Sequence, residues 1–236
     1  MSRANTPFDE YAHHYDTWFL KNRNVLQSEV LLLKRFMDNP GRALSVGCGS
    51  GLFEHILRGE HGIDISHGVE PAEGMARIAA KRGLNVKPGT AEQLPSEDNE
   101  FDTVLLNGIT GYVDDLGPVF GEAARVLKQG GRIVVADVPA ESSYGLLYAL
   151  VGHIGSWDVP SLTNVAPAHA YPAEFVGRAR WRTTGEKAEV LRSAGFVDLE
   201  FAQTLTRHPK YSNDSVEEPI DGFDRGDYVA IRGRKA

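Results

Sequence analysis

Three glycines at alternate positions, Gly47, Gly49 and Gly51, directly follow a short apolar run at residues 43–46. The run predicts a buried strand, and the apolar spacing from Leu52 to Leu57 predicts a helix behind the glycines. Glycine suits such a loop because the backbone must adopt positive φ angles and let a ligand approach closely. The helix offers unpaired N–H groups and a partial positive charge to an anionic group. The stretch therefore predicts a strand–loop–helix unit that binds a ligand at its glycines.

The glycine spacing separates two classes of ligand. A dinucleotide-binding loop has glycines at its first, third and sixth positions, and here the sixth position is Leu52. A dinucleotide-dependent oxidoreductase therefore remains only a weaker alternative. Glu70 lies 23 positions after Gly47, close to the roughly 20-residue offset at which an acid after the second strand binds a ribose. Pro71 is suited to begin the next helix, in which Met75 faces inward.

The rest of the chain alternates apolar runs with helical spacing. Further strands are predicted at 84–87, 101–106, 132–137, 197–205 and 227–232, with helices between them. Asn107 and Gly108 end the fourth strand, and Gly130 and Gly131 are predicted to cap the helix before the fifth. The polar, acidic segment 209–224 is predicted to be a surface loop.

Five features in this order resemble class I S-adenosylmethionine-dependent methyltransferases of the ubiquinone/menaquinone-biosynthesis-like group. They are the Gly47-x-Gly49-x-Gly51 loop, Glu70, the Thr90-Ala91-Glu92-x-Leu94-Pro95 turn, Gly130-Gly131 and the closing strand pair. The tail, with Ala194-Gly195-Phe196 and Arg207-His208-Pro209, is similar to a poorly characterised prokaryotic subgroup. The resemblance implies a doubly wound, mostly parallel seven-stranded α/β sheet whose last strand is antiparallel.

The same resemblance implies methyl transfer from S-adenosylmethionine to a small molecule through an N, O or S atom. The cofactor-binding residues that it implies are Tyr15, Gly47, Cys48, Gly49, Gly51, Glu70, Pro71, Met75, Thr90, Ala91, Glu92, Asn107 and Gly108.

Two positions depart from the family's pattern. Ser45 stands where the first motif usually has an acid that helps to hold the cofactor's methionine end, and Thr90 stands where an aspartate is common. These departures favour an alternative, a catalytically silent S-adenosylmethionine-binding or regulatory module with the same fold.

We expect one methyltransferase domain over 1–236. It comprises N-terminal helices at 1–40, a cofactor-binding half at 41–137, a substrate-recognition insertion at 138–182 and a C-terminal helix and strand pair at 183–236. The aromatic face formed by Tyr11, Tyr15, Trp18 and Phe19 is either a lid over the cofactor or an ordinary core-facing helix. The insertion is long and irregular, which is typical of a binding loop.

Transfer to nitrogen or oxygen needs a group that removes a proton, and histidine titrates near neutral pH. The catalytic candidates are His153, His169 and Tyr171, with Asp158, His13 and His14 as further possible bases.

Composition restricts the partners. The net charge of −7 argues against nucleic-acid binding, and the basic stretch Arg178–Arg182 is read as solvated or ion-paired. The single cysteine, Cys48, suits a reducing compartment, and no apolar run approaches the roughly 20 residues that span a bilayer. We expect a cytoplasmic monomer or homodimer without membrane insertion, and we assign no metal ligands.

Overall fold

The computed structural model describes residues 12–236, with side chains from His14 onward. Tyr11 and His13, which the sequence analysis singled out, lie outside these described residues or side chains. The described chain forms one mixed sheet in the order β3-β2-β1-β4-β5-β8-β6-β7. Its strands are β1 (Ala43–Val46), β2 (His67–Val69), β3 (Asn85–Lys87), β4 (Phe101–Asn107), β5 (Leu127–Asp137), β6 (Phe196–Thr204), β7 (Ile220–Asp221) and β8 (Tyr228–Lys235).

Five neighbouring strands, β3 to β5 in the sheet order, run parallel, and β8 is antiparallel to both β5 and β6. The predicted insertion of the last strand in antiparallel orientation is thus confirmed. The predicted count of seven strands is wrong, because Ile220 and Asp221 pair with β6 as an eighth strand, inside a segment predicted to be a loop. Such a short edge strand is defined by its partner, and its two residues carry no periodic signal of their own.

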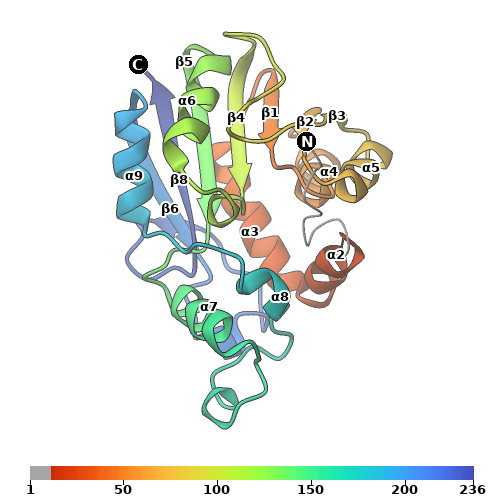
Figure 1. Cartoon of the computed structure of the whole chain (residues 1–236), viewed down its shortest axis with the longest axis vertical. Coiled ribbons are helices and arrows are strands. Elements are labelled where there is room, and N and C mark those ends of the chain that lie inside the picture. Colours follow the sequence, from red (N-terminus) through yellow and green to blue (C-terminus); the bar gives the residue numbers. More distant parts are fainter. Residues whose placement is uncertain (1–11) are drawn as a thin grey trace.

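Helices cover both faces of the sheet (Figure 1). They are α2 (Ala12–Lys21), α3 (Arg23–Phe36), α4 (Leu52–His61), α5 (Glu73–Lys81), α6 (Leu116–Val126), α7 (Ser143–Ile154), α8 (Ala173–Val176) and α9 (Thr184–Ser193). In β5, Val134 and Ala136 pack in the core with α3 and α4, while Ile133 and Val135 pack in the core with α6 and α9. Burial on both faces explains why residues 133–136 of this strand are an uninterrupted apolar run.

The helix before β5 ends earlier than predicted. It ends at Val126, and Gly130 and Gly131 lie within β5 rather than at the helix terminus. Gly130 has a φ of +73°, and the pairing of β5 with β4 shifts register between Phe101 and Thr103. The two glycines therefore serve an irregularity in the strand and not a helix cap.

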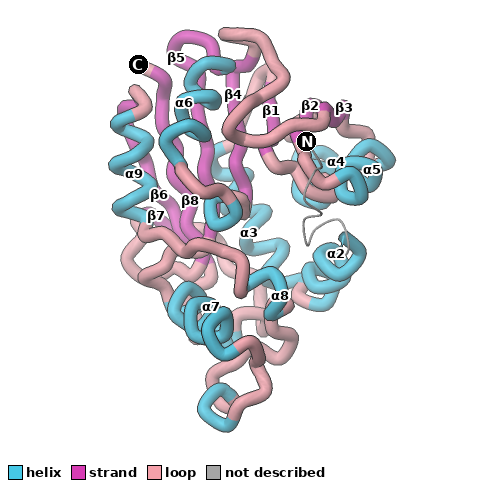
Figure 2. The backbone as a smooth tube through the Cα atoms, viewed as in Figure 1, coloured by secondary structure: helices cyan, strands magenta, loops and turns pink. Residues whose placement is uncertain are grey.

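The insertion at 138–182 lies beyond the carboxyl ends of the parallel strands, where Figure 2 shows loops and short helices around α7 and α8. The indole of Trp18 on α2 donates to the carbonyl of His169 at 2.8 Å, and that of Trp157 donates to the carbonyl of Tyr171 at 2.7 Å. The first bond fastens the insertion to α2, and the second joins two parts of the insertion itself. Within residues 12–236, none of the helices has the length and apolarity needed to cross a bilayer.

Candidate active site

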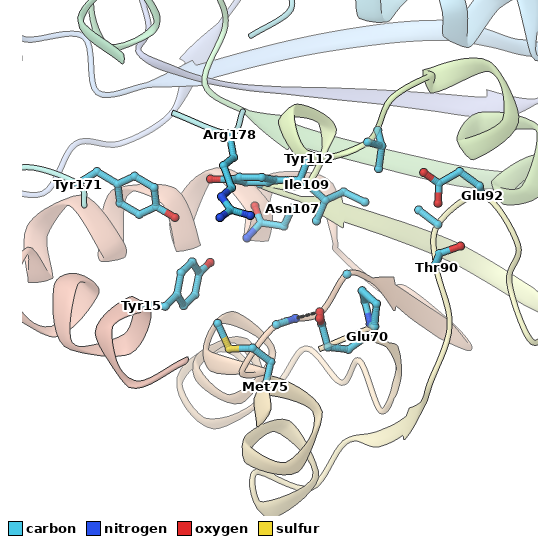
Figure 3. A pocket seen from close by; sticks show the side chains of 16 residues that line it. Tyr15, Glu70, Met75, Thr90, Glu92, Asn107, Ile109, Tyr112, Tyr171 and Arg178 are labelled. Atoms are coloured by element: carbon cyan, nitrogen blue, oxygen red, sulfur yellow. Dashed lines mark hydrogen bonds between the residues drawn. The ribbon is translucent and has the colours of Figure 1, made fainter. Parts of the chain in front are cut away.

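A cavity of about 400 Å³ opens at the carboxyl ends of β1 to β4. In an open α/β sheet this edge is where ligands bind, and the volume lies in the range typical of small-molecule sites. Figure 3 shows Glu70, Thr90 and Glu92 on one side of the cavity and Tyr15, Tyr112, Tyr171 and Arg178 on the other. The lining comprises Tyr15, Gly47, Gly49, Glu70, Pro71, Met75, Thr90, Ala91, Glu92, Asn107, Gly108, Ile109, Tyr112, Val113, Tyr171 and Arg178.

The glycine loop forms the floor of this cavity. Gly49 has a φ of +53°, and a Cβ atom built on it would meet nothing within 4 Å. Gly47 has a φ of +64°, and a Cβ atom there would lie 2.6 Å from Cγ2 of Ile109. Both positions therefore need glycine for their backbone conformation, and Gly49 also leaves room for a ligand against the backbone.

Two of the cofactor candidates, Cys48 and Gly51, do not line the cavity. Cys48 is buried against Ala79 and Leu84, and burial raises the pKa of its thiol. A Cβ atom on Gly51 would lie 3.1 Å from Cβ of Ala79, so this glycine permits close packing of the loop against α5. Both residues support the loop from behind.

Glu70 joins the end of β2 to the glycine loop. Its Oε2 accepts from the amide of Gly49 at 2.9 Å, and its Oε1 accepts from the amide of Ala72 at 2.8 Å. The carboxylate is almost fully buried, yet it lines the cavity. Each carboxylate oxygen has a further lone pair, so the group can still accept bonds from a ligand's hydroxyls.

The loop after β3 is held in place by α6. Glu122 accepts from the amide of Leu94 at 2.8 Å, and Arg125 donates to the carbonyls of Leu94 and Ser96. Arg125 also pairs with Glu122, and its hydrogen bond lowers the pKa of that carboxyl. This pair positions Thr90, Ala91 and Glu92 along the rim of the cavity without contacting the cavity itself.

Ser45, the first departure from the family pattern, does not line the cavity. Its hydroxyl donates to Oε1 of Glu54 at 2.6 Å, and both side chains are buried. Burial raises the pKa of the Glu54 carboxyl, and the bond from Ser45 opposes that rise. A carboxyl from the first turn of α4 therefore lies beside the position where the family has its acid.

A second cavity of about 70 Å³ adjoins the first and shares Tyr15, Gly108, Tyr112 and Tyr171 with it. It lies among α2, α3, α7 and the carboxyl ends of β4 and β5, and we call it the deeper cavity because most of its lining residues are buried. Its lining consists of Tyr15, Trp18, Phe19, Glu29, Gly108, Tyr112, Asp137, Val138, Tyr148, Tyr171, Trp181 and Tyr228. Tyr112 and Tyr171 are electrostatic neighbours at the shared wall.

Helix α2 is attached to the glycine loop through Asp16. Ser50 donates to Oδ1 of Asp16 at 2.5 Å, and Arg82 pairs with Oδ2 at 2.6 Å. Arg82 also donates to the carbonyl of Ser50 at 2.8 Å. These contacts hold Tyr15, one residue before Asp16, in the wall common to both cavities.

The structure separates the three catalytic candidates. His153 is exposed near the end of α7, and His169 is exposed in the insertion, so neither lines either cavity. Asp158 and His14 are also exposed and outside both linings. Only Tyr171 lines the cavities, but burial raises the pKa of its hydroxyl well above 10. It therefore stays protonated near neutral pH and is suited to donating a hydrogen bond rather than removing a proton.

Several lining residues were missed in the sequence. Ile109, Tyr112 and Val113 directly follow the predicted end of β4, so extending that prediction by a few residues would have found them. Arg178 came from the basic stretch predicted to be solvated or ion-paired; it is exposed, but its guanidinium points into the cavity (Figure 3). Glu29 is an isolated acid that no local pattern marks, whereas Asp137 ends the strand predicted at 132–137, and that position at a carboxyl end of the sheet was a usable signal.

Comparison with known proteins agrees with this geometry. A family model described as a methyltransferase domain matches residues 44–135. An uncharacterised protein of Methanocaldococcus jannaschii is 31% identical over 97% of this chain and 98% of its own length. A demethylmenaquinone methyltransferase of Geobacillus kaustophilus is 31% identical over 84% of this chain and 90% of its own length.

A solved structure from Thermotoga maritima is also similar along the whole chain. It is described as a SAM-dependent methyltransferase, possible histamine N-methyltransferase. It is 34% identical, covers 97% of this chain and 98% of its own, and superposes with a TM-score of 0.83. Together with the cavity at the glycine loop, these relatives show that the chain belongs to the S-adenosylmethionine-dependent methyltransferases.

Proposed function

We propose that the enzyme transfers a methyl group from S-adenosylmethionine, bound in the 400 Å³ cavity, to a small molecule bound in the adjoining 70 Å³ cavity. The observation that carries the proposal is the wall that the two cavities share. A cofactor along the glycine loop and an acceptor in the deeper cavity would meet at that wall. S-adenosylmethionine supplies a sulfonium methyl group, so the protein mainly has to position the two reactants.

The lining suggests which residues hold the cofactor. Glu70 lies where an acid meets the ribose hydroxyls in a nucleotide-binding α/β fold. Thr90 to Glu92 would border the adenine, and the open space at Gly49 would admit the methionine part. The guanidinium of Arg178 has no ion-pair or hydrogen-bond partner among the described residues, and we assign it to the cofactor's carboxylate.

The insertion at 138–182 would recognise the acceptor. It contributes Tyr148, Tyr171 and Trp181 to the deeper cavity, and α2 contributes Tyr15 and Trp18. We therefore keep the proposal that residues 138–182 are a substrate-recognition segment and that α2 acts as a lid.

Incubation of the protein with S-adenosylmethionine and small amines, phenols, thiols and carboxylates, followed by mass spectrometry, tests this function. We expect one class of acceptor to gain the mass of a methylene group while S-adenosylhomocysteine accumulates in equal amount. Cofactor binding without transfer to any of the four classes would contradict the proposal and favour the catalytically silent module.

A further inference from the structure

Glu29 on α3 is a buried acid that lines the deeper cavity and has no hydrogen-bond or ion-pair partner among the residues that the structure describes. Its residue is only 5% exposed. Among the residues that the structure describes, its carboxyl group has neither a hydrogen bond nor an ion pair. A buried carboxyl without a partner is costly, and such groups are normally paired or hydrogen-bonded.

The second acid of this cavity, Asp137 at the end of β5, differs from Glu29 in its hydrogen bonding. Its oxygens accept from the amide of Val138 at 2.8 Å and from the amide of Thr110 at 3.0 Å, and the hydroxyl of Thr110 also donates to it. The buried ammonium of Lys187 is an electrostatic neighbour of Asp137 but does not line the cavity. Asp137 is thus hydrogen-bonded within the protein, whereas Glu29 has no such partner in the described part of the chain.

The surroundings of Glu29 disfavour an isolated negative charge. Burial raises the pKa of its carboxyl well above the ordinary value, and the charge of Asp137 raises it further. No cation of the described chain offsets either effect. A positively charged ligand in the cavity would supply the missing counter-charge.

The walls of the cavity suit such a ligand. Eight of its twelve lining residues are aromatic. The rings pack against one another: the ring centroids are 5.0 Å apart for Trp18 and Tyr171, and also 5.0 Å apart for Tyr148 and Trp181. Aromatic faces attract alkylammonium groups, more strongly when the site is shielded from water. The volume of about 70 Å³ holds an ammonium group with one or two carbons attached.

We infer that the methyl acceptor is a small amine, which binds as an ammonium ion with its nitrogen between the Glu29 carboxyl group and the aromatic walls of the deeper cavity. This inference rests on the proposed methyl transfer. A carboxylate acceptor would be repelled by the two acids, and a neutral phenol would leave Glu29 without a counter-charge.

The reaction then balances with the groups present. The ammonium ion gives one proton to the Glu29 carboxylate, whose environment favours protonation. The freed lone pair of the nitrogen forms the new N–C bond while the C–S bond breaks and its electron pair stays on sulfur. The products are the methylated ammonium ion and S-adenosylhomocysteine. The proton on Glu29 leaves to solvent before the next turnover.

Calorimetric titration of the protein saturated with S-adenosylhomocysteine tests the inference without requiring turnover. The probes are matched pairs that fit the volume of the deeper cavity, methylamine with methanol and ethylamine with ethanol. The variants are Glu29→Gln, which keeps the shape of the side chain, and Glu189→Gln, the same change at an exposed position of α9.

We expect at least one amine to bind at least about tenfold more tightly than its alcohol, because a charge-assisted contact is lost with the alcohol. In Glu29→Gln this preference should disappear while the affinity for S-adenosylhomocysteine stays the same, and Glu189→Gln should behave as wild type. The wild-type comparison of amine with alcohol remains decisive if Glu29→Gln fails to fold.

Equal binding of amine and alcohol, or no amine binding, would overturn the inference while leaving the proposed function intact. Loss of S-adenosylhomocysteine affinity in a folded Glu29→Gln variant would also overturn it, because the carboxyl would then serve the cofactor. Failure of the wild type to bind S-adenosylhomocysteine is a separate result that would overturn the proposed function itself.

Discussion

At the scale of single residues, the cavity at the glycine loop is shaped by one contact, between the carboxylate of Glu70 and the amide of Gly49. The bond couples the acid after β2 to the loop after β1, so one side chain both holds the glycine loop and faces the cavity. The open space at Gly49 is the second feature that shapes the cavity. Single substitutions can remove either the carboxylate of Glu70 or the open space at Gly49.

Replacing Glu70 with alanine should weaken S-adenosylhomocysteine binding by about 10- to 100-fold, because hydrogen bonds to a charged group are lost and the loop amide loses its acceptor. Isothermal titration calorimetry measures the change. Glu73→Ala, at an exposed position in the first turn of α5, is the matched control and should bind as wild type. Unchanged affinity in Glu70→Ala would show that the ribose assignment is wrong.

Replacing Gly49 with alanine should lower both stability and affinity. The left-handed backbone costs an alanine about 1–2 kcal/mol, and the added methyl group fills space meant for the ligand. Gly62→Ala separates the two effects, because Gly62 has a φ of +68°, equally open surroundings and no place in the cavity. Urea unfolding should show similar losses of stability in both variants. Calorimetry should show weaker binding of S-adenosylhomocysteine, by about tenfold, only in Gly49→Ala. Equal affinity in the two variants would contradict the claim that the open space at Gly49 admits the cofactor.

At the scale of elements, helix α2 connects the two cavities. Its Asp16 binds Ser50 of the glycine loop and Arg82 after α5, while Tyr15 and Trp18 line the deeper cavity. The side chains of Asp16 and Arg82 are 14% and 22% exposed, so solvent screens this pair less than the surface pairs. The position of α2 and the shape of the deeper cavity are therefore linked.

Replacing Asp16 with alanine should loosen α2. We expect faster hydrogen exchange of the α2 amides and S-adenosylhomocysteine binding weakened by about two- to tenfold, because the ion pair and the bond from Ser50 are both lost. Arg77→Gln breaks the exposed pair with Glu73, which has side chains 71% and 74% exposed, and should change neither quantity. If α2 exchanged at the wild-type rate in Asp16→Ala, the helix would be held by its apolar contacts alone.

At the scale of the whole molecule, the sequence predicted the elements that repeat a pattern and missed what the topology assembles. The apolar runs of β1, β4 and β5, the glycine loop and the offset to Glu70 are local signals, and they predicted most of the residues that line the cavity at the glycine loop. The two-residue strand β7 exists only through its pairing with β6. Glu29 and Asp137 lie far apart in the chain, and they line one cavity because α3 packs against β5. His153 and His169 were predicted as bases because histidine titrates near neutral pH. The folded chain leaves both exposed and outside the two cavities, which no local sequence pattern could indicate.

Stability should depend on pH through Asp227. Burial raises the pKa of its carboxyl from 3.8 to about 6, and the hydrogen bond from the Tyr144 amide opposes the rise. Because the pKa of Asp227 is higher in the folded than in the unfolded state, its protonated carboxyl stabilises the fold relative to its ionised form. This contribution to the free energy of unfolding is complete below about pH 4 and is lost as the pH rises through 6.

Urea unfolding of wild type and Asp227→Asn at pH 4 and pH 7 tests this. The stability of wild type relative to the variant should fall with rising pH by on the order of 1–3 kcal/mol. Asp114→Asn, at a position whose side chain is 91% exposed, serves as the control. A wild-type stability that stays constant relative to Asp227→Asn would contradict the assigned shift.

The central claim is that the cavity at the glycine loop binds S-adenosylmethionine, and calorimetric titration of the wild-type protein with S-adenosylhomocysteine tests it most directly. We predict one site per chain with a dissociation constant in the micromolar range, and no heat of binding with NAD. Binding of NAD without binding of S-adenosylhomocysteine would contradict the account, since the loop and Glu70 would then hold a dinucleotide.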